Sequence, residues 1–173
     1  SHTQIKINET KIKLLENSPK AVISKINGFC FTGGLELALS ADLIYIANEA
    51  KLGDTHAILG FRPSWGLTQR LPKYIGIARA KELSFTAKTI SGIQAVEYGI
   101  ALEAFPINEL DSRVNEIALK ISENSPNSIK AYKDLYLAAS NKGLTEGLKY
   151  EANTSYDIPE VKERVQEFLK KLR

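Results

Sequence analysis

One stretch of alternating strand and helix signals constrains the fold of this chain more than any other feature. Ala21–Ile26 is rich in residues typical of a strand and ends at the turn pair Asn27-Gly28. The glycine pair Gly33-Gly34 then precedes the helix formers of Leu35–Ser40, and Leu43–Ala47 is an apolar run typical of a buried strand. The order strand, glycine turn, helix and strand predicts an α/β domain.

The character of the sequence changes near residue 106. Upstream, apolar runs are short and interrupted by glycine, whereas downstream the pattern is helical throughout. We therefore expect an α/β core over residues 1–106 and a helical oligomerisation region over residues 107–173. Helices are predicted at 9–17, 77–86, 92–98, 110–122, 128–140, 145–155 and 159–172, with a helical turn at 67–71 and a last strand at 100–105.

The downstream helices carry more apolar residues than one thin layer can bury. Large side chains recur on one face of these helices, at Leu144, Leu148, Val161, Val165, Phe168 and Leu172. Such faces favour packing against another subunit, so the pattern predicts a homo-oligomer.

Composition excludes several classes of protein. A chain of 173 residues that is 43% hydrophobic can bury a core, and its net charge of +3 gives little support to nucleic-acid binding. Apolar runs of about five residues are too short to cross a bilayer, so we expect a soluble, cytoplasmic protein with no membrane partner. The single cysteine cannot form an internal disulfide. The two histidines lie more than fifty residues apart, so we expect no local zinc motif and no metal.

The sequence contains no methionine, although average usage of about 2% predicts roughly three or four in this length. Ser1-His2 is typical of the remnant of a cleaved tag, and Thr3–Asn8 has the pattern of a first strand. We therefore expect the N-terminal part of the core to be incomplete in this sequence.

The densest chemical signal is the run from Asn27 to Ala38. Glycines at a strand-to-helix turn let backbone N–H groups approach a ligand, and the helix N-terminus that follows favours negative charge. Such a turn can form an oxyanion hole, the set of donors that stabilises charge on a carbonyl oxygen. Glu36 lies in the first turn of that helix between apolar neighbours, so it is a candidate acid/base. It could equally complement the helix dipole or cap the turn.

These residues resemble the fingerprint of the enoyl-CoA hydratase/isomerase, or crotonase, superfamily. The similarity extends over about residues 18–105 and includes Asn27-Gly28, Gly33–Ala38, Ala41–Tyr45, Ala50–Gly53, Leu59-Gly60, Gly66–Leu71, Gly76, Thr86 and Ser91–Gly99. The resemblance implies a crotonase-like spiral of ββα units with a helical C-terminal trimerisation subdomain. It also implies a homotrimer or a dimer of trimers.

The resemblance further implies an enoyl-CoA hydratase, which is a lyase, or an enoyl-CoA isomerase. Such an enzyme acts on an acyl-CoA thioester through an enolate held in an oxyanion hole. Gly33 would donate one backbone N–H to the hole, and Glu36 is at the position of the first catalytic glutamate. Gly34 and Trp65 would line the substrate site. Coenzyme A would be part of the substrate, with no separate cofactor, and the second oxyanion donor would come from a segment before Ser18.

The chain departs from the family pattern at His56, which is at the position of the second catalytic glutamate. A neutral imidazole can take a proton, but its charge and geometry differ from those of a carboxylate. His56 is thus a candidate catalytic residue that could equally line the site. Isomerisation needs a single proton shuttle and suits one carboxylate better than hydration does. A different class of function is also open, namely a non-catalytic oligomeric acyl-CoA-binding or scaffold protein.

Five further residues have competing interpretations. Asp54 is interpreted as a turn former rather than a second acid, and Cys30 as a small buried residue rather than a nucleophile. Trp65 could pack in the core instead of bounding the acyl group. Arg62 and Arg70 could meet phosphate, although an ion pair on its own helix is favoured for Arg70. The basic C-terminal residues predict a solvated helix face, namely Lys162, Lys170, Lys171 and Arg173.

Overall fold

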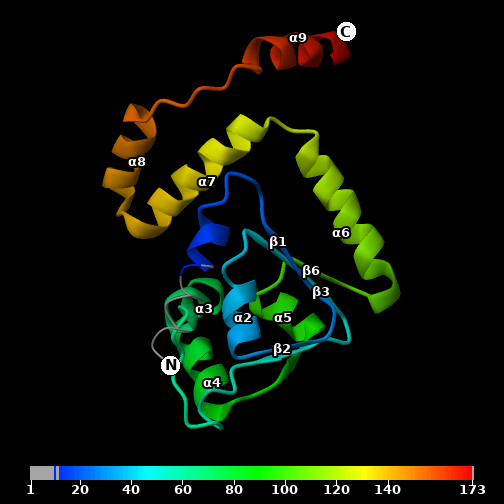
Figure 1. Cartoon of the computed structure of the whole chain (residues 1–173), viewed down its shortest axis with the longest axis vertical. Coiled ribbons are helices and arrows are strands. Elements are labelled where there is room, and N and C mark those ends of the chain that lie inside the picture. The colour runs from blue at the N-terminus through cyan, green and yellow to red at the C-terminus, as the bar shows by residue number, and fades with distance from the viewer. Residues whose placement is uncertain (1–9, 11, 173) are drawn as a thin grey trace. The chain divides into compact units, whose positions relative to one another are not determined.

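The computed structural model describes residue 10 and residues 12–172 of the chain. The predicted strand at residues 3–8 lies outside the described residues. The chain divides into two units, one made of Ser1–Ser18 and Val22–Ala118 and the other of Pro19–Ala21 and Leu119–Arg173 (Figure 1). The division falls inside a helix, further along the chain than the change of character near residue 106.

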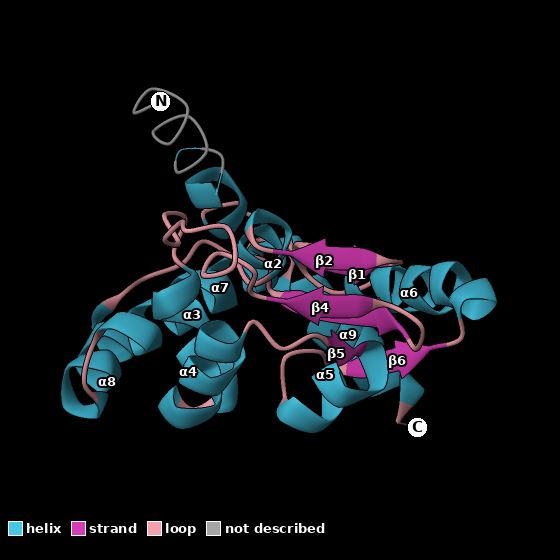
Figure 2. Cartoon of the chain, turned by 90° about the horizontal axis from the view of Figure 1, so that it is seen from below, coloured by secondary structure: helices cyan, strands magenta, loops and turns pink. Residues whose placement is uncertain are grey.

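Two small sheets form the framework of the first unit (Figure 2). The first sheet is parallel, in the order β1 (Ile23–Ile26), β3 (Leu43–Ala47) and β6 (Glu103–Phe105). The second sheet has the order β2 (Phe29–Phe31), β4 (Lys51–Gly53) and β5 (Ile90–Ser91), with β4 parallel to β2 and antiparallel to β5. The strands β2, β4 and β5 were not predicted, because strands of two or three residues show no periodicity.

The register of the second sheet brings two loops together. Phe31 of β2 pairs with Gly53 of β4, and the next backbone N–H, that of Thr32, donates to the carbonyl oxygen of Gly53 at 3.1 Å. Because the two strands are parallel, the chain leaves both of them at the same edge of the sheet. The residues that follow β2 and those that follow β4 therefore begin side by side.

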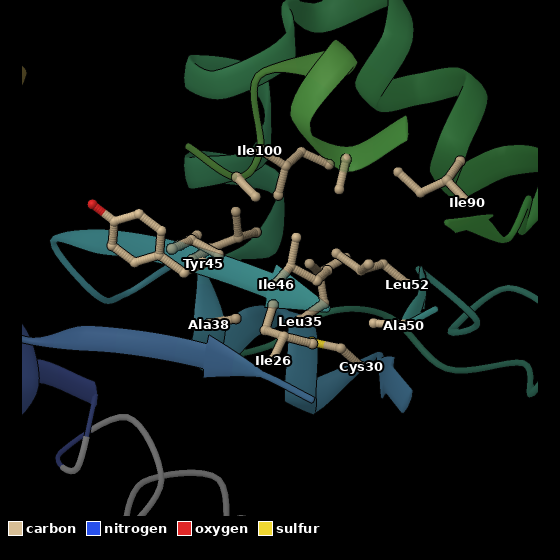
Figure 3. Close-up of a cluster of buried hydrophobic side chains, with 14 of the residues drawn as sticks. Ile26, Cys30, Leu35, Ala38, Tyr45, Ile46, Ala50, Leu52, Ile90 and Ile100 are labelled. Carbon is tan, nitrogen blue, oxygen red and sulfur yellow. The ribbon is translucent and has the colours of Figure 1, made fainter. Parts of the chain in front are cut away.

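Buried aliphatic side chains from the first sheet and from α2 (Gly33–Ala38) form the centre of the core. Ile46 on the middle strand β3 and Leu35 on α2 both have 0% exposure. Figure 3 shows Leu35 and Ala38 close to Ile46 and to Ile26 of β1. The apolar run of β3 is thus buried on both faces, as expected for a strand inside a parallel sheet.

The remaining helices of the first unit follow the glycine and capping signals of the sequence. They include a short helical segment at residues 12–16, α3 (Leu67–Ile75), α4 (Ile77–Thr86), α5 (Gly92–Tyr98) and the first part of α6 (Ile107–Ser122). The N-cap of α5 is Ser91, whose hydroxyl accepts from the Gln94 N–H while the Gln94 side chain accepts from the Ser91 N–H. This capping box begins α5, and Gly99, at φ 86°, ends it as predicted.

The second unit contains α7 (Pro126–Asn141), α8 (Leu144–Asn153) and α9 (Val161–Lys171). Polar contacts connect its elements: Asp134 accepts from the hydroxyls of Tyr150 and Tyr156 at 2.9 and 2.5 Å. Glu160 accepts from Ser125 and Asn127, and these hydrogen bonds lower its pKa to about 2. Apolar side chains of α8, of α9 and of the residue that caps α9 are exposed on this chain, namely Leu144, Leu148, Val161, Val165, Phe168 and Leu172.

No helix within residues 12–172 is both long enough and apolar enough to cross a membrane.

Candidate active site

The candidate site lies where the chain leaves β2 and β4. Thr32, directly before Gly33, has the unusual backbone angle φ 47° for a residue with a side chain. Its hydroxyl lies 3.3 Å from that of Thr55 in the loop that follows β4. Left-handed backbone in a non-glycine residue is strained and persists where its surroundings hold it in place. The turn that begins α2 is therefore held against the loop that carries Asp54 and His56.

Glu36 points inward from the first turn of α2 and is 1% exposed. Its Oε1 accepts hydrogen bonds from the backbone N–H groups of Trp65 at 2.8 Å and Leu67 at 3.2 Å. Leu67 is the first residue of α3, whose N-cap, Gly66, has no side chain to cap the helix. Glu36 thus caps α3, which is a different helix from the one that carries it. The sequence suggested a cap on the turn of its own helix, whereas the structure shows a cap on α3, and Oε2 is left to face His56.

His56 is 9% exposed and is held between two carboxylates. Its Nε2 lies 3.7 Å from Oε2 of Glu36, which is within ion-pair distance but longer than a hydrogen bond. On the other side of the ring, Nδ1 lies 2.6 Å from Oδ1 of Asp54. Asp54 is itself 2% exposed. The structure therefore brings the two predicted acid/base candidates together and adds a third buried group behind them.

The interpretation of Asp54 as a turn former is confirmed but incomplete. Its Oδ1 accepts from the backbone N–H of His56 at 3.1 Å, which is the side-chain-to-backbone bond that forms such a turn. The same oxygen also contacts the imidazole ring. Sequence reasoning did not identify this second contact, although Asp and His two residues apart after a strand can lie on one side of the chain.

Trp65 packs directly against the start of α2. A Cβ added to Gly33 would lie 2.6 Å from Cζ3 of the Trp65 ring, closer than carbon atoms approach in folded proteins. The backbone of Trp65 is held as well, because its N–H donates to Glu36 and its carbonyl oxygen accepts from the Arg70 guanidinium at 2.6 Å. Gly33 is therefore needed for the close approach of the indole to the first residue of α2.

Gly33→Ala is expected to displace the indole ring and to destabilise the first unit by about 1–3 kcal/mol, as overpacking does. Trp65 is the one tryptophan in the sequence, so its fluorescence emission reports the displacement directly. Gly34→Ala is the matched control, because the added Cβ has no atom nearer than the Cys30 sulfur at 4.0 Å. Emission that stays unchanged in Gly33→Ala would contradict the tight contact.

The other residues singled out in the sequence lie in the core or on the surface and take no part in the Glu36–His56–Asp54 contacts. Cys30 is 6% exposed, and burial raises the pKa of its thiol to about 11, so it is a protonated core residue, as expected. Arg62 is exposed and donates to the adjacent carbonyl of Pro63. Arg70 forms an ion pair, but its partner is Glu16, at 2.6 Å, instead of a residue on its own helix. The lysines expected on a solvated face are exposed, namely Lys162, Lys170 and Lys171.

The donor set of the site does not match a metal centre. Among residue 10 and residues 12–172, no group of three or more histidine, cysteine, aspartate or glutamate side chains is arranged to hold a metal ion. One oxygen of Glu36 accepts hydrogen bonds from two backbone N–H groups, and one oxygen of Asp54 contacts the ring of His56. The arrangement is instead suited to proton transfer, with a carboxylate and an imidazole facing each other in a largely water-excluded position.

Comparison with known proteins places the chain in a family. The family model described as enoyl-CoA hydratase/isomerase matches residues 3–173. The crystal structure of an enoyl-CoA hydratase from Bacillus anthracis superimposes with a TM-score of 0.91 at 34% identity, over 98% of this chain and 67% of that one. The chain belongs to the enoyl-CoA hydratase/isomerase family, and the crotonase-like fold predicted from its sequence is confirmed.

Two further relatives carry information about ligands. The short-chain-enoyl-CoA hydratase of Clostridium acetobutylicum is 37% identical over 134 residues, which are 78% of this chain and 49% of that protein. A structure from Thermobifida fusca, solved in complex with acetoacetyl-CoA, is 27% identical with a TM-score of 0.79, over 83% of this chain and 56% of that one. The chain spans between about half and 62% of the length of the curated relatives that it matches.

Proposed function

We propose that the protein to which this chain belongs acts on an acyl-CoA thioester, as an enoyl-CoA hydratase or an enoyl-CoA isomerase. One observation carries this proposal: the buried Glu36 carboxylate and the His56 imidazole face each other at 3.7 Å beside the turn that begins at Gly33. Family membership supports the substrate class, as does the acetoacetyl-CoA bound to the relative from T. fusca. Coenzyme A is then part of the substrate, and no separate cofactor takes part.

The roles of the residues follow from their chemistry. The backbone N–H of Gly33 donates to the thioester oxygen as negative charge develops on it, and a donor of this kind lowers the barrier by about 3 kcal/mol. Glu36 moves the proton through Oε2, while its Oε1 stays bound to the backbone of α3. His56 is the second proton-transfer group. Gly34, which is exposed in the first turn of α2, and the Trp65 ring, which packs against Gly33, would contact the acyl thioester.

Hydration and isomerisation require different numbers of proton-transfer groups, and the candidates for these groups are Glu36 and His56. Hydration adds the hydroxyl group of water at Cβ and a proton at Cα, so it needs one group to take a proton from the water and a second to deliver a proton. With His56 facing Glu36, the imidazole would have to take one of these parts. Isomerisation moves one proton between the α and γ carbons, and Glu36 alone can carry it. Isomerisation is therefore the second candidate, favoured by a histidine where the family pattern has a glutamate.

The test is turnover of two thioesters by the same protein preparation. Loss of the enoyl-thioester absorbance of crotonyl-CoA measures hydration, and a gain of that absorbance from a 3-enoyl-CoA measures isomerisation. We expect turnover of at least one of them. CoA binding by calorimetry with no turnover of either would overturn the catalytic proposal and leave the non-catalytic acyl-CoA-binding protein considered from the sequence.

We infer that the second unit takes part in assembly, as the sequence predicts. The exposed apolar side chains of α8 and α9, such as Leu144 at 80% exposure and Phe168 at 62%, support packing against another subunit. A homotrimer or a dimer of trimers stays a prediction from the family resemblance.

A further inference from the structure

We propose that Asp54 is a positioning residue that holds the imidazole of His56 with its proton on Nδ1 and with the lone pair of Nε2 directed at Glu36. The contact itself is a property of the fold, and only its consequence for turnover rests on the proposed function. Asp54 would touch no reacting atom and would act entirely through His56.

The contacts assign the tautomer. Oδ1 of Asp54 lies 3.1 Å from the backbone nitrogen of His56, a group that can only donate, so this oxygen acts as an acceptor. The same Oδ1 lies 2.6 Å from Nδ1 of the ring, a distance that requires a proton between the two atoms. An ionised carboxylate can only accept, so with Asp54 ionised that proton is on Nδ1. In a neutral imidazole the other nitrogen, Nε2, is then unprotonated.

The lone pair of Nε2 would let His56 accept a proton from Glu36. Nε2 lies 3.7 Å from Oε2, the glutamate oxygen that is turned away from the backbone of α3. A proton leaving the Glu36 carboxyl group can bind to this lone pair, which leaves a carboxylate on Glu36 and an imidazolium on His56. The Asp54 carboxylate then balances the cation from the far side of the ring. With the proton on Nε2 instead, a neutral imidazole could not accept it.

Burial distinguishes this role from that of an ordinary turn residue. The turn alone needs one acceptor oxygen, which asparagine or serine supplies as well, and it forms equally at an exposed position. Asp54 is 2% exposed, and burying a carboxylate costs free energy unless a partner compensates it. The imidazole at 2.6 Å is that partner. The negative charge of Asp54 therefore stabilises the position of the His56 ring as well as the backbone turn.

The test reads the tautomer by nuclear magnetic resonance. The sequence has two histidines, so a His2→Gln variant assigns the imidazole signals in a long-range ¹H–¹⁵N correlation spectrum. In the wild type we expect the pattern of an Nδ1-protonated ring for His56. In Asp54→Ala we expect the population to move toward the Nε2-protonated form. A wild-type ring protonated on Nε2, or a tautomer ratio unchanged in Asp54→Ala, would overturn the proposal.

Asp54→Asn separates the tautomer from the charge and guards against misfolding of the alanine variant. Because the His56 backbone N–H donates to the same oxygen as the ring, the amide oxygen of asparagine should stay in place and keep the proton on Nδ1. We expect the wild-type tautomer with lower turnover. Glu97→Gln, an exposed carboxylate on α5, is the control and should match the wild type in both measurements.

Turnover supplies the second measurement. With the enoyl-CoA that the wild type prefers, Asp54→Ala is expected to lower kcat roughly 100-fold, with KM within about 2-fold, because Asp54 does not touch substrate. A changed tautomer with an unchanged kcat would overturn the positioning role. If the wild type turns over no enoyl-CoA, the proposed function fails, whereas the tautomer of His56 still decides whether Asp54 holds the ring.

Discussion

Glu36→Gln is expected to lower kcat on the preferred enoyl-CoA by about 10²- to 10⁴-fold while CoA still binds, because the amide cannot take up or release the proton. Glutamine fits the site: its oxygen can accept from the N–H groups of Trp65 and Leu67, and its amide nitrogen would face Nε2 of His56. Steady-state kinetics with crotonyl-CoA and with a 3-enoyl-CoA, combined with calorimetry of CoA binding, measure both expectations.

Glu36→Ala is the partner variant that separates chemistry from structure. It removes the acceptor of two backbone N–H groups at the start of α3, and each buried donor left unpaired costs about 1–3 kcal/mol. We therefore expect Glu36→Ala to be inactive and less stable, and Glu36→Gln to be inactive with near-native stability. A Glu36→Gln protein that keeps most of its turnover would remove Glu36 from the acid/base role.

Ile46→Ala is expected to lower the free energy of unfolding of the first unit by about 2–5 kcal/mol, the range for truncating a buried isoleucine. Ile46 is 0% exposed on β3, the middle strand that pairs with both β1 and β6. The cavity would open between Leu35 of α2 and the sheet, where neighbours can fill it only in part (Figure 3). Urea titration followed by Trp65 fluorescence measures the change, since this tryptophan is in the first unit.

Ile93→Ala is the matched control for that truncation. Ile93 is on α5 in the same unit and is 52% exposed, so the same change of side chain should alter stability by no more than about 0.5 kcal/mol. Equal losses at the two positions would mean that burial on β3 does not decide the stability of this unit.

Elements with local signals could be predicted from the sequence. The apolar run Leu43–Ala47 is a strand with the predicted bounds, and Gly92–Tyr98 is a helix with both of its predicted ends. The reason is that a buried parallel strand and a capped helix are encoded by adjacent residues, here Ser91, Gln94 and Gly99 for the helix. Exposed apolar faces on α8 and α9 likewise follow from residue spacing alone.

Elements that depend on distant partners could not be predicted in this way. The helical turn expected at residues 67–71 continues to Ile75 through Pro72, because Leu67, Leu71 and Ile75 are buried on one face and their burial offsets the lost backbone hydrogen bond. The strands β2 and β4, of three residues each, exist because they pair with each other. Neither has a period that a sequence pattern could reveal.

The sequence alone was sufficient to predict the family fold and to single out Gly33 and Glu36, because a glycine turn and the residues around it are consecutive in the chain. His56 was singled out only by its position in the family pattern. Only the tertiary structure decided that Glu36 caps α3 and that Asp54 contacts the far side of the His56 ring. Those contacts connect three segments: the one that follows β2, the one that follows β4 and the start of α3. Their geometry depends on the pairing of the two short strands, which acts across the fold and not along the chain.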